Sequence, residues 1–306
     1  MPHRFTRELA RLGPQRSYGP VSLSLARAYC SHLARTHYEN FSVASLLLPR
    51  RLLQPFHNVY AYCRWADDLA DETGGGTRAL RLLRWWREEL LSCYGGRPRH
   101  PVLIALRDTI HEYGIPPQPF LDLLYAFEQD QLIKRYRTFE QLLGYCRYSA
   151  NPVGHLVLYL CRCYDPGRAA LADHICTALQ LTNFWQDVAR DLDIGRVYLP
   201  EADRRHFGYS DADLMARRFT PAFAAVLRDE VDRTRSMFYR GLPLVAKMPS
   251  EVRGDIELFA RGGLAILRKI EKINYNVWRR RPVLSKWEKG KLLLGALWRR
   301  VMTALW

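Results

Sequence analysis

Hydrophobic residues recur with a helical period through almost the whole of this 306-residue chain. No alternation of apolar and polar residues, which would mark a half-buried strand, persists for more than a few positions. Glycine and proline interrupt the pattern and divide it into helices of ordinary to long length. The interruptions are Gly74–Gly76, Gly95–Pro98, Gly114–Pro117, Asp165–Gly167 and Gly241–Pro243. Because no repeat, linker or composition shift marks a second domain, we expect one all-α domain over residues 1–306.

The charge balance is strongly basic, with 46 Lys and Arg against 31 Asp and Glu and a net charge of +15. Such an excess favours an anionic partner, which could be nucleic acid, an acidic membrane surface or a phosphorylated substrate. Zinc-finger spacing, an RNP-like strand and a long lysine run are all missing from the sequence, so we expect no nucleic-acid partner. A basic surface without any partner is the open alternative.

Seven cysteines stand mostly inside apolar helical runs, and none forms a C-x₂-C pair. An odd number of such cysteines favours reduced thiols in a cytoplasmic protein. The N-terminal stretch lacks the apolar core of a signal peptide. No run of 18 apolar residues is present, so we expect no helix that spans a membrane.

Two helical segments each carry a pair of aspartates at positions i and i+4, Asp67 with Asp71 and Asp187 with Asp191. Residues at that spacing lie on one face of a helix, where two like charges destabilise it by a few tenths of a kcal/mol, roughly, unless they are neutralised. A solvated helix face explains one such pair well. Two pairs, both inside aromatic and aliphatic sequence, indicate instead carboxylates facing a shared cation cluster. Hard oxygen ligands of this kind favour Mg²⁺ completed by substrate phosphates.

Tyr60 and Arg64 lie on the same helical stripe as Asp67 and Asp71. The stripe therefore combines an aromatic ring, a guanidinium suited to phosphate and two carboxylates suited to metal. This combination strengthens the metal-and-phosphate interpretation of the first segment.

The longest weakly patterned stretch, residues 194–220, directly follows the second aspartate pair. It could be a lid that closes over a bound substrate and excludes water, or an ordinary surface loop. Both interpretations stay open.

The C-terminal residues 284–306 are predicted to form an amphipathic helix. Its apolar face holds Leu294, Trp298, Val301 and Leu305, and its basic face holds Lys289, Arg299 and Arg300. Such a helix could lie on an anionic membrane surface, or it could dock on the core with its basic face in solvent.

From about residue 20 to about residue 290 the chain resembles the squalene/phytoene synthase family. Residues 41–49 and 60–72 resemble the first signature of that family, and residues 180–200 resemble the second. Residues 145–154 resemble the helix between them. The two signatures together are highly specific, whereas either one alone would be only moderately so.

The resemblance implies a single-domain isoprenoid synthase helical bundle with a central cavity. Asp67, Asp71, Asp187 and Asp191 would hold Mg²⁺, which triggers loss of diphosphate from a prenyl substrate. Phe41, Tyr60 and Tyr148 would line the cavity, where aromatic rings stabilise a cation. The other substrate-binding residues that it implies are Arg64, Asn183, Gln186, Arg196 and Tyr198.

Two positions depart from the pattern of the condensing members of the family. Those members usually carry a basic residue two positions before Phe41, where this chain has Glu39. They also usually carry an arginine just before the first aspartate of the second motif, where this chain has Gln186. With two cations fewer, the chain is suited to a substrate that carries a single diphosphate.

These departures, with residues 183–188 and 279–287, resemble the hydroxysqualene synthase branch of bacterial hopanoid pathways. The resemblance implies ionisation of presqualene diphosphate, rearrangement and capture by water, with no NADPH. Glu39 or His37 would position that water or accept its proton, unless Glu39 simply pairs with an arginine. We expect a cytoplasmic enzyme, peripheral on the inner face of the membrane, that receives its substrate by handover from a presqualene diphosphate synthase.

Two rival interpretations remain. The first is a head-to-head synthase that condenses two prenyl diphosphates to presqualene diphosphate, squalene or a carotenoid precursor. The second is a catalytically silent helical assembly factor on the same fold, although such proteins tend to lose the aspartates that this chain keeps.

Overall fold

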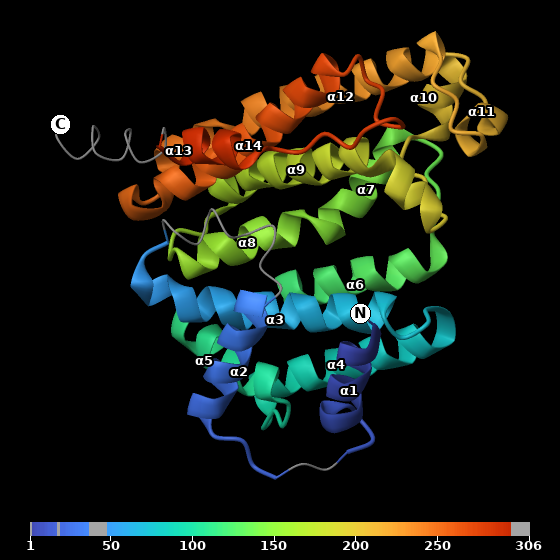
Figure 1. Ribbon diagram of the computed structural model, residues 1–306. Coiled ribbons are helices and arrows are strands. Elements are labelled where there is room, and N and C mark those ends of the chain that lie inside the picture. Colours follow the sequence, from blue (N-terminus) through green and yellow to red (C-terminus); the bar gives the residue numbers. More distant parts are fainter. Residues whose placement is uncertain (1, 17–18, 37–47, 295–306) are drawn as a thin grey trace. The chain divides into compact units, whose positions relative to one another are not determined.

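The computed structural model describes residues 2–16, 19–36 and 48–294. Over these residues the fold is all-α, which confirms the fold class predicted from the sequence (Figure 1). Within the described ranges, β-type backbone pairing is limited to one isolated bridge between Arg135 and Val197. The predicted interruptions coincide with helix boundaries, as they do at Gly74–Gly76, where one helix begins, and at Asp165–Gly167, where another begins.

The chain forms two compact units. Unit 1 comprises Met1–Leu132 with His155–Cys163, and unit 2 comprises Ile133–Gly154 with Tyr164–Trp306. Compact units within one chain are not by themselves independently folding domains, so the single-domain expectation stays a prediction. The central cavity implied by the resemblance stays a prediction as well.

Unit 1 is built mainly from six helices and part of a seventh. These are α1 (Pro2–Leu12), α2 (Leu23–Thr36), α3 (Arg50–Asp71), α4 (Gly76–Gly95), α5 (Pro101–Tyr113), α6 (Gln118–Leu132) and the end of α8 (Asn151–Leu160). The core side of α3 carries Tyr62 and Trp65, which stack on Trp86 of α4 at centroid distances of 5.8 and 5.5 Å. Buried Asn58 fixes the same side by donating to the Ala105 carbonyl and to Thr109. This packing directs Tyr60, Arg64 and Asp67 away from the core.

Unit 2 is centred on α9 (Pro166–Asp193), which Asp165 caps by accepting from the Arg168 amide at 2.8 Å. Its other helices are α7 (Phe139–Ser149), α10 (Glu201–His206), α11 (Asp211–Met215), α12 (Pro221–Gly241), α13 (Pro243–Lys247) and α14 (Ser250–Lys272). Helices α12 and α14 both pack on α9 (Figure 1). Gly241 allows a close approach, because a Cβ at that position would lie 2.6 Å from Ile175 Cγ1. Buried Trp185 of α9 donates to Thr234 of α12 at 2.8 Å, which locks the rotation of α9.

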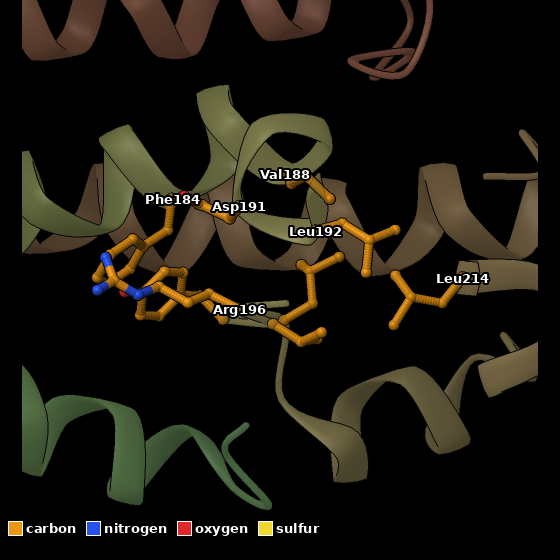
Figure 2. Close-up of a pocket in the computed structure, with 9 residues that line it drawn as sticks. Phe184, Val188, Asp191, Leu192, Arg196 and Leu214 are labelled. Carbon is orange, nitrogen blue, oxygen red and sulfur yellow. The ribbon is translucent and has the colours of Figure 1, made fainter. Parts of the chain in front are cut away.

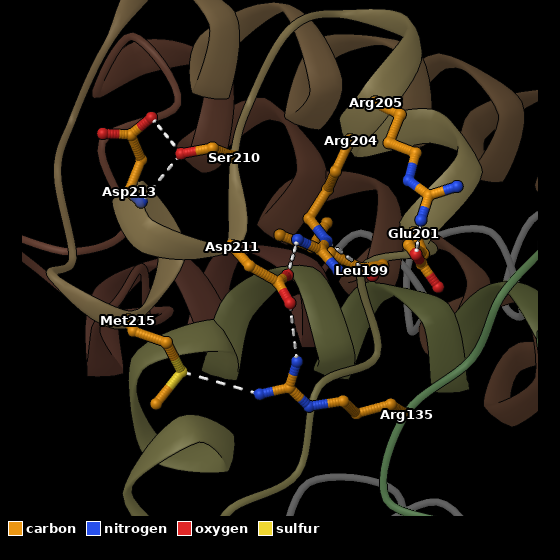
Figure 3. A network of polar contacts seen from close by, with 9 residues as sticks. All are labelled: Arg135, Leu199, Glu201, Arg204, Arg205, Ser210, Asp211, Asp213 and Met215. Carbon is orange, nitrogen blue, oxygen red and sulfur yellow. Dashed lines mark hydrogen bonds and ion pairs between the residues drawn. The ribbon is translucent and has the colours of Figure 1, made fainter.

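Residues 194–220 contain two short helices, α10 and α11, where the sequence pattern indicated only a lid or a loop. A polar network connects them (Figure 3). Arg204 is nearly fully buried, pairs with Asp211 and donates to the Leu199 carbonyl. Arg135 also pairs with Asp211, at 3.1 Å. The segment also buries apolar side chains, among them Leu199, Tyr209 and Leu214, but without a regular helical spacing, so its hydrophobic pattern is weak.

After α14 the chain reverses through Asn274 and Tyr275, whose φ angles of 50° and 63° are both left-handed. We call residues 273–285 the return segment. Val277 is buried, and the Trp278 ring lies 5.2 Å from that of Phe223. Residues 286–294 are helical. In the described ranges, no helix has both the length and the apolar character needed to cross a bilayer.

All seven cysteines lie in the described ranges and are free thiols, four of them buried. Five of the seven lie inside helices, whereas Cys161 and Cys163 follow the end of α8. The predicted C-terminal helix is described only as far as Leu294, so most of its apolar face lies outside the described residues.

Candidate active site

The first aspartate motif lies on the last turns of α3 in unit 1. Arg64 makes its principal contact with Asp68, a buried residue that the sequence analysis did not single out. It also approaches Asp67 at 3.2 Å and Glu72 at 3.4 Å. The guanidinium is thus already held by carboxylates, and the side chain of Asp67 keeps 43% of its surface exposed. The i,i+4 spacing of Arg64 and Asp68 could have revealed this pair from the sequence.

The acidity of the Asp68 carboxyl is strongly perturbed by its surroundings. Burial raises its pKa to about 7, although the adjacent Arg64 acts in the opposite direction. Half-buried Tyr60 has a raised pKa for the same reason, because burial disfavours the phenolate. Tyr60 therefore carries its proton at neutral pH and presents a neutral aromatic ring, as its assigned role on the cavity wall requires.

The second motif lies on α9 in unit 2, where the Asp187 carboxylate is held by an arginine. Arg281 of the return segment binds both of its oxygens, Nε contacting Oδ1 and Nη2 donating to Oδ2 at 2.8 Å. This hydrogen bonding raises the pKa of the Arg281 guanidinium. Gln186 is buried and donates its amide to the Pro282 carbonyl. The residue just before Asp187 therefore points at backbone of the return segment.

Asp191 and Arg196 come together at the end of α9 (Figure 2). The Arg196 amide donates to the Asp191 carbonyl at 2.8 Å, and Gly195 provides the left-handed turn between them with φ 75°. Both side chains line a small hollow with room for about one water molecule. The remaining lining residues are apolar or aromatic: Phe184, Val188, Leu192, Val197, Tyr198, Leu199 and Leu214.

Tyr198 forms the wall of that hollow. Its ring stacks on Phe184 at a centroid distance of 3.6 Å and lies 5.8 Å from Tyr136. Tyr198 is buried in this aromatic group. Its sequence-predicted contact with substrate stays a prediction.

Tyr148 on α7 is half-buried, and Asn183 on α9 is exposed one turn before Asp187. Asn183 and Asp187 therefore share a helix face. His37, Glu39 and Phe41, the other predicted site residues, lie outside the described residues.

The donor set at both motifs fits a hard divalent cation. In the described part of the chain, no three His, Cys, Asp or Glu side chains gather into a group that could hold a metal ion. Pairs of carboxylates on one helix face nevertheless suit Mg²⁺, which typically uses one or two carboxylates and takes further oxygens from substrate phosphates and water. The shared cation cluster stays a prediction.

Sequence reasoning missed the role of Arg281. The fork on Asp187 joins residues 94 positions apart, and no local pattern connects them. The three consecutive arginines at 279–281 were visible in the sequence, but only the fold distinguishes which of them reaches α9.

Residues 34–288 match the family model described as squalene/phytoene synthase. The chain is 30% identical over 283 residues to a 15-cis-phytoene synthase of Synechococcus elongatus, covering 88% of this chain and 91% of that protein. Among solved structures, it is similar to the squalene synthase HpnC of Alicyclobacillus acidocaldarius, with 43% identity, a TM-score of 0.80, and 84% of this chain and 97% of that one covered. A dehydrosqualene synthase in complex with ligand also gives a TM-score of 0.80, at 26% identity over 90% of this chain and 96% of that one.

Proposed function

Because the chain belongs to the squalene/phytoene synthase family, a family of prenyl diphosphate synthases, we propose that it is a hydroxysqualene synthase. Its substrate in this proposal is presqualene diphosphate. The carbon–oxygen bond to diphosphate breaks, the resulting cation rearranges, and a water molecule forms the new carbon–oxygen bond as it loses a proton. The products are hydroxysqualene and diphosphate, and no reductant is consumed.

Identity reaches 43% with a squalene synthase, against 30% with a phytoene synthase and 26% with a dehydrosqualene synthase, which favours a squalene-type reaction over a carotenoid-type one. The observation that carries the choice of a substrate with a single diphosphate is the orientation of Gln186. Its neutral amide is turned to the Pro282 carbonyl, so position 186 supplies no cation for a second diphosphate.

In this proposal the carboxylates of Asp67, Asp71, Asp187 and Asp191 hold Mg²⁺. When bound, the ion stabilises the negative charge that develops on the leaving diphosphate. Arg64 and Arg196 contribute guanidinium groups for diphosphate oxygens, and Asn183 extends the polar face of α9 beside Asp187.

The aromatic residues have a separate role. Tyr60 and Tyr148 are half-buried, so their rings are shielded from bulk water without being sealed in the core. Ring faces attract a cation most strongly where water is excluded. Phe41 would add to the same wall, and Glu39 or His37 would position the capturing water and accept its proton.

The second candidate is a head-to-head synthase that condenses two prenyl diphosphates. The specific observation in its favour is that the chain covers 91% of a phytoene synthase and 96% of a dehydrosqualene synthase. Its substrate class is the same, but two diphosphates must be accommodated.

Product analysis distinguishes the two functions. The purified protein is incubated with Mg²⁺ and no NADPH, in one tube with presqualene diphosphate and in another with farnesyl diphosphate. We expect hydroxysqualene from the first tube and no prenyl product from the second. A condensation product from farnesyl diphosphate would instead establish the head-to-head reaction. An Asp187→Asn variant serves as the control for metal-dependent turnover.

A further inference from the structure

Several contacts of the return segment fix the position of the Arg281 backbone. The two left-handed residues at 274 and 275 are held by amide hydrogen bonds, in which the Tyr275 amide donates to the Ile270 carbonyl at 2.9 Å. Left-handed conformations cost free energy outside glycine and persist only where the surroundings impose them. Farther along, the buried Val277 side chain anchors the segment, and the Pro282 carbonyl accepts from Gln186. Arg281 is thus fixed by its backbone immediately before a buried hydrogen bond.

The Arg281 guanidinium occupies both oxygens of the Asp187 carboxylate. The two groups form a bidentate fork, the geometry in which arginine binds carboxylates most strongly. About a third of the Arg281 side chain and a fifth of the Asp187 side chain are exposed, so the pair is partly shielded. Arg190 is also near Asp187, but at 3.7 Å and with 68% of its side chain exposed. Arg281 is therefore the principal counter-cation.

This arrangement conflicts with direct metal binding by Asp187. A divalent cation needs at least one of the oxygens that Arg281 holds, and two cations on one carboxylate repel each other. Arg64 in the first motif differs, since its main contact is Asp68 and not the predicted ligand Asp67.

We propose that Arg281 is an exchangeable counter-cation that links metal binding to diphosphate binding at the second aspartate motif. While no divalent cation is present, the guanidinium neutralises Asp187. When a cation takes the carboxylate, the fork opens and the guanidinium becomes available to oxygens of the substrate diphosphate. This inference rests on the proposed function, because it requires Asp187 to be a metal ligand.

Two consequences follow from this exchange. The metal binds more weakly than the carboxylates alone would allow, because it must displace a bound cation. The diphosphate binds better once metal is present, because Arg281 is then available to it. Linked binding of this kind typically changes an affinity by about 5- to 150-fold.

The test uses Mn²⁺, which shares the oxygen-ligand preference of Mg²⁺ and is read by electron paramagnetic resonance, without any prenyl substrate. We expect Arg281→Gln to tighten Mn²⁺ binding at least about fivefold. Arg281→Lys keeps the positive charge but cannot form the bidentate fork, so its Mn²⁺ affinity should lie between those of the unsubstituted protein and Arg281→Gln. Arg190→Gln, which removes a positive charge from the same helix face, should change the affinity less than about twofold, as expected for an exposed and screened pair.

A second arm titrates inorganic pyrophosphate calorimetrically at saturating Mn²⁺. Here Arg281→Gln should bind pyrophosphate at least about fivefold more weakly, whereas Arg190→Gln should match the unsubstituted protein. Mn²⁺ binding by Arg281→Gln that is unchanged or weaker would overturn the exchange.

Asp187→Asn separates failure of this inference from failure of the proposed function. If Asp187→Asn weakens Mn²⁺ binding while Arg281→Gln leaves it unchanged, the inference alone is wrong. If Asp187→Asn binds Mn²⁺ as the unsubstituted protein does, Asp187 is not a ligand, and the metal assignment fails together with the inference. Circular dichroism and thermal unfolding of each variant confirm that it is folded.

Discussion

At the scale of single residues, unit 2 contains a charged cluster around the buried carboxyl group of Glu230. Glu230 on α12 has no exposed surface and lies 3.2 Å from Arg233, which also contacts Asp203 at 3.1 Å and Asp229 at 2.6 Å. The Arg233 guanidinium stacks over the Phe139 ring at 4.3 Å. One arginine thus joins α12 to α10 and to the start of α7, and it serves three carboxylates at once.

Glu230 gives the first prediction, on pH dependence. Burial raises its pKa well above the usual value, and this outweighs the attraction of Arg233. The folded state therefore holds this proton more tightly than the unfolded state does. The associated stability is full below the unfolded pKa and is lost as pH rises through the folded pKa, with a slope of at most about 1.4 kcal/mol per pH unit. Glu230→Gln imitates the protonated form, so it should be more stable than the unsubstituted protein at pH 8 and lose that advantage toward pH 4.

Urea unfolding at several pH values measures this difference. The control is Asp232→Asn, an exposed aspartate on the same helix, which should leave the pH dependence of the unfolding free energy unchanged. Parallel stability curves for Glu230→Gln and the unsubstituted protein would show that burial does not raise the pKa of this carboxyl.

At the scale of helices and the segments between them, hydrophobic patterns in the sequence predict some parts of the fold and miss others. The long helices α3 and α9 follow from periodicity, and α9 begins at an Asp-Pro signal that marks a helix start. Helices α10 and α11 did not follow from periodicity, because helices of six and five residues are too short to show a repeating apolar face and the Arg204–Asp211 ion pair between them leaves no hydrophobic signal. The same reason hid Arg281, whose partner lies 94 positions away in the sequence. The contact of Asp68 with Arg64 was predictable in principle from their i,i+4 spacing.

The α10–α11 network gives a prediction that compares two neighbouring arginines (Figure 3). Arg204 is 4% exposed and donates to both Asp211 and the Leu199 carbonyl, whereas Arg205 is 77% exposed and pairs with Glu201. Arg204→Met should lower the unfolding free energy by about 1–3 kcal/mol, because it removes charge-assisted hydrogen bonds from a buried group. Arg205→Met should cost less than about 0.5 kcal/mol, as exposed i,i+4 pairs do.

Chemical denaturation gives the two free energies, and limited proteolysis within residues 194–220 shows whether the loss is local. Faster cleavage in Arg204→Met than in Arg205→Met is the expected result. Equal behaviour of the two variants would mean that apolar contacts, and not this network, hold the segment. A turnover defect in Arg204→Met at unchanged global stability would favour the lid interpretation of the segment.

At the scale of the whole molecule, charge and substrate chemistry point to a lipid surface. The net charge is +15, and the proposed substrate and product are long-chain lipids that partition into membranes. The helical residues 286–294 expose Trp287 (70%) and Leu294 beside Lys286, Lys289 and Lys291. Exposed aromatic and aliphatic groups next to lysines are typical of helices that lie in an anionic membrane interface. We therefore propose that the C-terminal part of the chain binds such a surface, in agreement with the amphipathic pattern of residues 284–306.

Flotation with vesicles that contain anionic lipid tests this proposal. Removal of residues 284–306 should abolish most of the bound fraction, and Trp287→Ser should reduce it because the indole supplies apolar area at the interface. Tyr239→Ser is the matched control, since Tyr239 is also an exposed aromatic residue of unit 2 but lies on α12. Binding should weaken as salt rises, because each lysine near an anionic surface contributes roughly 1 kcal/mol that ions screen. If flotation persists after the truncation, the basic surface elsewhere on the molecule binds lipid. If neutral vesicles bind equally well, apolar insertion and not charge is responsible.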